Sequence, residues 1–522
     1  MLNLAHFVRE NSIHQPEKIA IRFADQSYSY AQLEALSNQV ANYLQSIDIK
    51  AGDKVALSCP NLPYFAFVYY GILKAGAVVV PLNVLLKPRE IAYHLDDSDA
   101  KALFVFEGTA ELPMAKMAKV AFDETDSCKN LIVMTANPAG ANPIAGSSHL
   151  SSIFATASSS FDMVATKEND TAVILYTSGT TGVAKGAELS HSNMVFNAIY
   201  SSKLFNKNIP AGERTALVVL PLFHSFGQTV LMNAMFYTAD TISLLARFDA
   251  EQTLEIIKKH NVNIFAGVPT MYWALLNQAK TADADTIAAV QNNLKVCASG
   301  GSALPVEILK AFEDTFDVPI MEGYGLSETS PVASFNHLER PRKAGSVGQA
   351  IFGVEMKIVD ENDQELEVGK TGEIVIRGHN VMKGYYKRPE ATAEAMKNGW
   401  FHSGDIGKMD DEGYFFIVDR VKDMVLRGGY NVYPREIEEV LLTHPDISLA
   451  AVIGVPNEAL GEEICAYVIL NQGAKTSSEE IVEWCKENMA NYKYPRMIRI
   501  RETLPMTATG KLLKRELRKE EA

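Results

Sequence analysis

The sequence lacks several features that define large classes of protein. It has only five cysteines, and none of them forms a C-x-x-C pair: Cys59, Cys128, Cys297, Cys465 and Cys485. Isolated cysteines are usually small core residues, so we expect neither a disulfide framework nor a zinc site. This usage suits a reducing compartment, and we predict a cytoplasmic protein.

An excess of positive charge is also lacking. The net charge is −14 and the isoelectric point is near 5.4. Without an overall cationic field there is nothing to gather nucleic acid, so we predict no nucleic-acid partner. A nucleotide needs only one local basic pocket, which this composition allows.

Long hydrophobic runs are absent as well. The most apolar stretch, residues 65–86, is interrupted by Lys74, Gly76, Pro81 and Asn83. A membrane span needs about 20 apolar residues, so we interpret this stretch as a buried helix followed by a buried strand. The opening segment "MLNLAHFVRENS" lacks the apolar core of a signal peptide. Peripheral membrane contact and a homodimer are left open.

What is present is an alternation of short β-rich runs and helical patterns. This alternation predicts an α/β protein, and 522 residues are too many for one core. The last hundred residues change to a compact α+β pattern of helices and strands. We therefore predict a large multi-layer N-terminal domain over residues 1–421 and a small α+β domain over residues 422–522. Residues 135–170 are rich in Ala, Ser, Asn and Pro and predict a surface connection.

One loop, in "YTSGTTGVAKG", suggests phosphate binding without the usual P-loop spacing. Counting from Gly179, that spacing needs glycine at position 184, where Ala184 stands, and Lys185 is followed by Gly186. Small residues let backbone N–H groups approach an anion, and hydroxyls and a lysine add donors. A plain Ser/Thr/Gly turn is the alternative.

Four further motifs accompany this loop in the chain: "GYGLSET", "WFHSGDIG", "DRVKDMVLRGGYNVYPREIE" and "PMTATGKLLKREL". In this order and spacing, the five motifs resemble the adenylate-forming superfamily, which includes acyl-CoA synthetases. The resemblance covers essentially the whole chain. It implies an ATP-dependent ligase that makes an acyl-AMP, releases pyrophosphate and transfers the acyl group to coenzyme A. It also implies that the small C-terminal domain is mobile.

The resemblance also implies a set of ATP-binding residues. These are Thr177, Ser178, Gly179, Thr180, Thr181, Gly182, Lys185, Gly301, Ser302, Ala303, Gly323, Tyr324, Gly325, Ser327, Asp405, Arg420 and Lys511. Glu328, with Thr177 beside it, matches the position that binds Mg²⁺. Taken alone, Tyr324 would be a core residue, Glu328 a surface or capping acid, and Asp405 and Arg420 ordinary turn and surface residues.

Two residues are implied to be catalytic. Lys511 would bridge the acid and the ATP phosphates as the two anions meet, although a lysine near a charged terminus is normally solvated. His224, in "PLFHSFGQ", would orient the carboxylate; a packing role is the alternative.

The same resemblance makes Lys422 the hinge between domains and places Gly428 and Gly429 along the pantetheine tunnel of coenzyme A. For the two glycines, a simple turn is the alternative.

The acyl site is expected to be apolar. Its implied residues are His224, Phe226, Gly227, Gly267 and Gly323. Gly323 is expected to leave the acyl pocket open where a bulky side chain would close it, which argues against acetate as the preferred acid. The segment "PLFHSFG" has no acidic residue to pair with the ammonium group of an amino acid, so amino acids are disfavoured. A medium- to long-chain fatty acid is the preferred substrate, and an aryl acid is its rival. An acyl-AMP ligase that loads a carrier protein and a silent nucleotide sensor stay as alternatives; a sensor would be expected to have lost Lys511 or Glu328.

Overall fold

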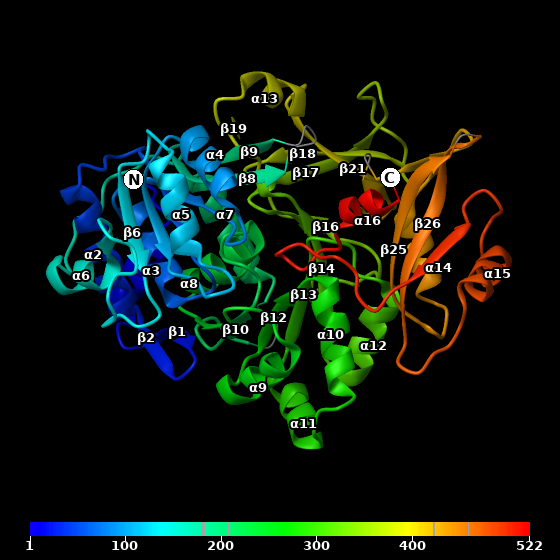
Figure 1. Cartoon of the computed structure of the whole chain (residues 1–522), viewed down its shortest axis with the longest axis horizontal. Helices are drawn as coiled ribbons and strands as arrows, with labels where there is room; N and C mark the ends of the chain where they lie inside the picture. Colours follow the sequence, from blue (N-terminus) through cyan, green and yellow to red (C-terminus); the bar gives the residue numbers. More distant parts are fainter. Residues whose placement is uncertain (179–182, 206–208, 421–422, 458, 522) are drawn as a thin grey trace.

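The computed structural model describes residues 1–178, 183–205, 209–420, 423–457 and 459–521. Within this part of the chain the strands form four sheets. Figure 1 shows a large body of layered sheets and helices on the left and a smaller unit, coloured orange to red, on the right. The predicted α/β class with a large N-terminal and a smaller C-terminal domain is confirmed.

The first sheet, sheet A, is mostly parallel at its centre. Its order is β16 (Gln349–Ala350), β15 (Val332–Phe335), β14 (Ile320–Gly325), β13 (Val296–Ser299), β12 (Ile264–Gly267), β10 (Thr215–Val218), β11 (Thr241–Leu244), β1 (Ile19–Phe23) and β2 (Gln26–Ser29). The central strands are buried along their whole length because helices cover both faces.

The second sheet, sheet B, contains both strands that flank the predicted phosphate loop. Its order is β19 (Gly384–Tyr385), β9 (Ala184–Ser190), β8 (Thr171–Ser178), β4 (Val78–Pro81), β3 (Lys54–Ser58), β5 (Ala100–Phe106), β6 (Asn130–Met134) and β7 (Ser148–His149). The short strand β19 therefore adds a segment from far along the chain to the edge formed by β9.

A layer of helices joins the two sheets. Its members are α3 (Pro63–Lys74), α7 (His191–Lys203), the π-helix η1 (Phe226–Asn233) and α8 (Ala234–Tyr237). Helices α3 and α7 contact strands of sheet B, whereas η1 and α8 contact strands of sheet A and pack against α7. Every residue of η1 is buried, and π-helices often occur at functional sites.

Other helices cover the outer faces and edges of these sheets. They are α1 (His6–His14), α2 (Tyr30–Ser46), α4 (Pro88–Ser98), α5 (Met114–Asp123), α6 (Leu150–Thr156), α9 (Ala250–His260), α10 (Pro269–Ala279), α11 (Ala284–Asn293), α12 (Val306–Phe316) and α13 (Pro389–Ala395). The short 3₁₀ turn η2 (Ser327–Thr329) instead contacts strands β8 and β9. Helix α2 begins with a complete capping box at Ser29 and Gln32.

The third sheet, sheet C, is antiparallel and is yellow-green in Figure 1. It consists of β17 (Val354–Val359), β18 (Gly372–Gly378), β21 (Trp400–Met409), β20 (Met396–Lys397) and β22 (Phe415–Arg420). Strands β21 and β22 carry two of the predicted nucleotide residues, Asp405 and Arg420, in direct register.

The C-terminal unit is built on the fourth sheet, sheet D. Its elements are β23 (Val425–Arg427), β24 (Tyr430–Val432), α14 (Pro434–Leu441), β25 (Ile447–Asn457), β26 (Gly461–Leu470), α15 (Ser478–Asn488), β27 (Met497–Ile500) and α16 (Lys514–Glu520). Two hydrophobic clusters of its own stabilise this unit. The predicted boundary at Lys422 lies outside the described residues and stays a prediction.

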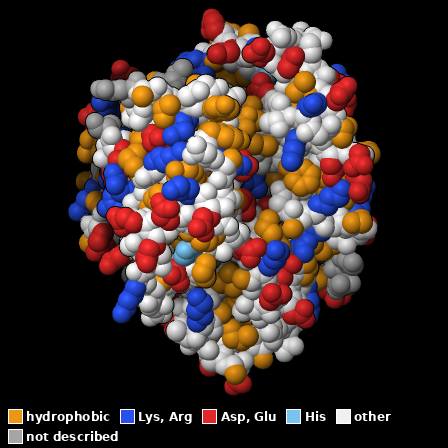
Figure 2. All heavy atoms as spheres, turned by 90° about the vertical axis from the view of Figure 1, so that its right-hand side faces the viewer, with side chains coloured by type: hydrophobic (Ala, Val, Ile, Leu, Met, Phe, Trp, Pro, Cys, Tyr) orange, Lys and Arg blue, Asp and Glu red, His pale blue; other side chains and the backbone are white. Residues whose placement is uncertain are grey.

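Figure 2 views the molecule from the side of this unit. Acidic and basic side chains are intermixed over the visible face, and hydrophobic side chains gather near its middle. Within the described residues, no helix is both long and apolar enough to cross a membrane.

Several local expectations can be compared with the structure. All five cysteines are buried and free, as expected of core residues. The stretch 65–86 forms the buried helix α3 and the buried strand β4. The expectation for residues 135–170 was wrong in part, because β7 and α6 interrupt the connection and α6 buries Leu150 and Ile153.

Candidate active site

The predicted phosphate loop connects two paired strands. Strands β8 and β9 are antiparallel, with Thr177 opposite Lys185 and Ser178 opposite Ala184. The hairpin brings the backbones of Thr177, Ser178 and Lys185 together where β8 ends. The remaining predicted loop residues, 179–182, lie outside the described residues.

Glu328, the predicted metal ligand, faces this hairpin from the 3₁₀ turn η2. Its side chain is mostly buried, and its Oε1 atom accepts hydrogen bonds from Thr177 Oγ1 at 3.3 Å and from the Tyr385 hydroxyl at 2.9 Å. Among the described residues, Oε2 has no hydrogen-bond partner. The residues therefore suit a divalent cation, because one carboxylate oxygen is held in place while the other is available.

Asp405, the predicted ribose ligand, is buried between two other predicted residues. The Tyr324 hydroxyl donates to Oδ2 at 2.7 Å, and Arg420 Nε lies 3.0 Å from Oδ1. Burial raises the pKa of the Tyr324 phenol, and Asp405 raises it further, so Tyr324 remains a hydrogen-bond donor. Each carboxylate oxygen has a second lone pair, which leaves acceptor capacity for ribose hydroxyls.

Lys511 is presented by a tight turn near the C-terminus. The turn is closed by a hydrogen bond from the Thr507 amide to the Lys511 carbonyl (2.7 Å), and Thr270 on α10 donates to the Gly510 carbonyl (2.6 Å). In Figure 1 the corresponding red segment extends from the right-hand unit into the centre of the molecule. Lys511 thereby reaches the large domain.

The amine of Lys511 lies over the backbone turn that follows β13. A Cβ atom added to Gly301 would lie 2.9 Å from Lys511 Cε and 3.4 Å from Nζ. Gly301 has a φ of +81°, so both its conformation and this close approach favour glycine. Ser302 and Ala303, the next two residues predicted along the adenine edge, follow directly in the chain.

Burial and charge lower the pKa of Lys511 to about 8. Desolvation is the largest cause, and the positive charge of Arg420 adds to it, while Asp405 opposes the shift. At neutral pH most of the amine therefore keeps its proton, but its charge lacks full compensation. An anion bound beside Gly301 would supply that compensation.

His224 lies near Lys511 and is neutral. Burial, with a smaller effect of the Lys511 charge, lowers its pKa to about 3. The Phe226 amide donates to His224 Nδ1 at 3.3 Å, which assigns the ring proton to Nε2. A neutral imidazole with a proton on Nε2 can donate one hydrogen bond to a carboxylate.

The predicted acyl-site glycines differ in what they face. A Cβ atom on Gly267 would touch the Phe265 ring at 3.1 Å, whereas one on Gly227 would lie 2.6 Å from the Pro221 carbonyl oxygen. Because Gly227 has no side chain, η1 can pack directly against the backbone carbonyl groups of Pro221 and Leu220. The Phe226 ring lies against Gly300, because a Cβ atom there would approach it to 3.1 Å.

The expectation for Gly323 was wrong in its reasoning. A Cβ atom on Gly323 would lie 2.1 Å from the ring of Phe335, its partner across β14 and β15. The space beside Gly323 is thus filled by an aromatic ring, so it leaves no room for substrate and gives no argument against acetate. Gly325 similarly faces the Pro331 carbonyl, and Ser327 begins η2.

The predicted coenzyme A residues lie elsewhere in this conformation. Gly428 and Gly429 form the two-residue turn between β23 and β24, with φ values of +57° and +84°. A Cβ atom on Gly429 would meet no atom within 4 Å. The structure therefore places these glycines at an open hairpin and does not bring them to Lys511. The predicted hinge, Lys422, lies outside the described residues.

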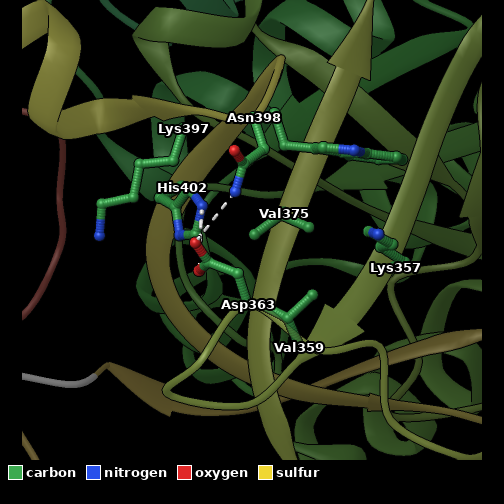
Figure 3. Close-up of a pocket in the computed structure, with 8 residues that line it drawn as sticks. Lys357, Val359, Asp363, Val375, Lys397, Asn398 and His402 are labelled. Carbon is green, nitrogen blue, oxygen red and sulfur yellow. Dashed lines mark hydrogen bonds and ion pairs between the residues drawn. The ribbon is translucent and has the colours of Figure 1, made fainter.

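A separate pocket lies on the outer face of sheet C (Figure 3). Its volume is about 80 Å³, too small for a nucleotide. Figure 3 shows His402 and Asn398 turned toward Asp363. His402 also contacts Glu373, which accepts a hydrogen bond from the Gly404 amide at 2.9 Å. This network therefore supports the turn directly before Asp405.

Sequence reasoning missed several residues of the site. Tyr385 holds Glu328, and Thr270 holds the Lys511 turn. Glu439 on α14 accepts a hydrogen bond from the Val306 amide at the start of α12 (3.3 Å), close to the buried Glu322. The tyrosine pair in "KGYYKRP" is the one sequence feature that could have indicated Tyr385. The other residues make contacts between distant segments, and such contacts leave no local sequence pattern.

Comparison with known proteins shows which family the chain belongs to. Residues 8–386 match the AMP-binding enzyme family, and residues 436–511 match the C-terminal domain of AMP-binding enzymes. The chain belongs to the AMP-binding enzyme family. With its curated relatives, this makes it an acyl-CoA synthetase, which activates an acid with ATP and forms a thioester through an acyl-AMP.

Two curated relatives represent different substrates. A long-chain-fatty-acid–CoA ligase of Bacillus subtilis (strain 168) is 35% identical, covering 99% of this chain and 94% of its own length. A feruloyl-CoA synthase of an Amycolatopsis species is 32% identical, covering 97% of this chain and 96% of its own length. Membership in the family therefore leaves the acid open.

A solved relative informs the domain arrangement. ATP-bound MatB from Rhodopseudomonas palustris is 30% identical and has a TM-score of 0.87, with 99% of both chains covered. Apo MatB, over 100% of this chain and 99% of its own, has a TM-score of 0.78. Taken as a whole, the present chain is thus more similar in structure to ATP-bound MatB than to apo MatB.

Proposed function

We propose that the structure represents the state in which the synthetase forms the acyl-AMP, and that its preferred acid is a medium- to long-chain fatty acid. The observation that supports the first part most strongly is the position of Lys511. An amine from the C-terminal turn reaches Gly301 in the large domain, near Asp405, Arg420 and His224.

In this proposal the residues neutralise and align two anions. An oxygen of the substrate carboxylate attacks the α-phosphorus of ATP, and the bond to pyrophosphate breaks. The Lys511 ammonium lies between the reactants and offsets their charge, and His224 Nε2–H orients the carboxylate. Asp405 holds the ribose, while Thr177 and Lys185 hold the phosphates.

Mg²⁺ belongs to the same proposal. Glu328 would hold the ion through its free oxygen, with Thr177 beside it, and the ion would supply charge neutralisation on the phosphates. The donor set supports this role, because the carboxylate is nearly buried and both of its hydrogen bonds are to one oxygen.

The second half-reaction requires a different arrangement. Coenzyme A must bring its thiol to the carbonyl of the acyl-AMP, whereas here the turn of Lys511 lies against Gly301 and Thr270 of the large domain. We propose that the C-terminal domain rotates about Lys422, withdraws Lys511 and brings the Gly428–Gly429 hairpin to the pantetheine chain. Because glycine has no side chain, these two residues would leave a narrow passage open for the pantetheine chain.

The choice of acid depends on apolar contacts. Phe226 is buried next to Gly300, and the nearby side chains Val268 and Met271 are also buried. Each methylene placed in such surroundings contributes roughly 0.8 kcal/mol, which favours longer chains. The feruloyl-CoA synthase relative keeps an aryl acid as the second candidate.

An acid panel tests both parts. Octanoate, palmitate, acetate, cinnamate and ferulate are each incubated with ATP, with and without Mg²⁺, and pyrophosphate release is measured; thioester formation is then measured with coenzyme A and with a carrier protein. We expect octanoate and palmitate to exceed acetate and the aryl acids, and only the Mg²⁺ samples to react. Equal or faster turnover of ferulate would replace the fatty-acid proposal, and transfer to the carrier protein alone would replace coenzyme A as acceptor.

A further inference from the structure

Tyr385 connects the two predicted phosphate-binding elements of the site. It lies in β19, which pairs with β9 so that Tyr385 is opposite Ala187. Strand β9 also carries Lys185, whose Nζ atom lies 5.3 Å from the centroid of the Tyr385 ring. The hydroxyl of the same side chain reaches Glu328 Oε1 at 2.9 Å. One side chain thus contacts both a phosphate lysine and a metal-binding carboxylate.

The geometry at Glu328 shows what this contact does. Thr177 and Tyr385 both donate to Oε1, and they come from β8 and β19, the two strands that pair with β9 on either side. A carboxylate held by two donors at one oxygen cannot rotate freely about its terminal bond, so Oε2 has a fixed direction. A fixed ligand oxygen favours a cation that demands near-ideal geometry, as Mg²⁺ does.

The segment around Tyr385 is itself anchored. The Tyr385 amide donates to Thr392 Oγ1 at 2.9 Å, and the Arg388 amide donates to the Tyr385 carbonyl at 3.0 Å. Arg388 forms an ion pair with Asp97 of α4, and Asp97 also accepts a hydrogen bond from the Tyr176 hydroxyl at 2.8 Å. These contacts therefore connect the Tyr385 segment to Tyr176, the residue directly before Thr177.

We propose that Tyr385 is a positioning residue for the Mg²⁺–ATP complex: its hydroxyl orients Glu328 toward the ion, and its ring places Lys185 beside the phosphates. This inference rests on the proposed use of ATP and Mg²⁺ at this site. It assigns Tyr385 no contact with reacting atoms.

Calorimetric titration of the full chain with ATP, in Mg²⁺ and in excess EDTA, tests the inference. Tyr385→Phe keeps the ring over Lys185 and removes only the hydroxyl. Because a hydrogen bond to a charged group is lost, we expect the affinity for ATP in Mg²⁺ to fall about tenfold. The affinity in EDTA should stay within about twofold, since the ring and Lys185 remain.

Tyr386→Phe is the matched control. The neighbouring Tyr386 hydroxyl also donates to a carboxylate, Asp99 Oδ2 at 2.8 Å, but that carboxylate belongs to the C-terminal cap of α4. Its removal should leave both affinities within about twofold. A purely structural role of Tyr385 would lower the affinity equally in both buffers, and that result would overturn the inference.

The outcomes separate this inference from the proposed function. If the wild-type chain gains affinity from Mg²⁺ and Tyr385→Phe gains it equally, the inference is wrong and the metal site stands. If the wild-type chain binds ATP equally in both buffers, the proposed metal site itself is wrong. As a second readout, the Mg²⁺ concentration for half-maximal pyrophosphate release should rise about tenfold in Tyr385→Phe alone.

Discussion

At the scale of single residues, charge is placed where it can act on an anion. Lys511 keeps its proton at neutral pH although burial and Arg420 lower its pKa to about 8. His224 stays neutral because burial lowers its pKa to about 3. The pair therefore offers one full positive charge and one neutral donor within the site, which suits two negatively charged reactants better than two cations would.

The pKa of Lys511 predicts a pH dependence. Its protonated form is the active one, so kcat/KM for pyrophosphate release should be unaffected by this group below pH 8. Above pH 8 it should fall by about tenfold per pH unit as the free enzyme loses the proton. His224 should contribute nothing between pH 5 and 9, because it is already neutral throughout that range.

Lys511→Arg is the control for this fall in kcat/KM above pH 8, and pyrophosphate release is measured from pH 6 to 10. The guanidinium stays charged over the whole range, so the fall above pH 8 should disappear even if activity is lower. An unchanged alkaline limb in Lys511→Arg would assign the titration to another group.

Some residues of the site were predictable and others were not. The motifs located Glu328, Asp405, Tyr324, Arg420 and Lys511, which the structure brings to one region. Tyr385 was missed because its importance depends on β19 pairing with a strand almost 200 positions earlier. A contact of that range has no signature in a single sequence.

At the scale of elements, the buried strands were the most predictable part. Runs such as "TAVILYT" and "EEICAYVIL" are short, apolar and β-branched, and they form β8 and β26. The π-helix η1 could not be predicted, because its sequence "FGQTVLMN" also suits an α-helix. Its geometry depends on packing, including the approach of Gly227 to backbone carbonyls.

Gly227→Ala tests this packing. An added methyl would meet the Pro221 and Leu220 carbonyl oxygens at 2.6 and 2.7 Å, and backbone cannot move aside easily. We expect the free energy of unfolding, measured by urea denaturation, to fall by about 1–3 kcal/mol. Chain-length preference in the acid panel should be unchanged.

Gly267→Ala provides the comparison, because the three atoms nearest to its methyl would belong to the side chains of Phe265 and Met271 and not to backbone. Its effect on stability should be below about 1 kcal/mol, whereas its effect on acid preference should be larger. The opposite pattern, with Gly227→Ala altering acid preference at normal stability, would return Gly227 to the acyl site.

At the scale of the whole molecule, both polar and apolar contacts hold the C-terminal domain against the large one. Thr270 binds the Gly510 carbonyl, and Glu439 binds the amide at the start of α12. Burial raises the pKa of the nearby Glu322 to about 7, and the charge of Glu439 adds to the shift. Trp273 of the large domain also packs against a hydrophobic cluster of the C-terminal unit, so this interface combines polar and apolar contacts.

The measurement that tests the account most directly compares the two half-reactions in Lys511→Ala. Pyrophosphate release with octanoate should fall by a factor of about 10²–10³, because the charge between the reactants is gone. Thioester formation from supplied octanoyl-AMP and coenzyme A should stay within about threefold of wild type, since in that step Lys511 has been withdrawn. Equal loss of both half-reactions, or unimpaired pyrophosphate release, would contradict the account.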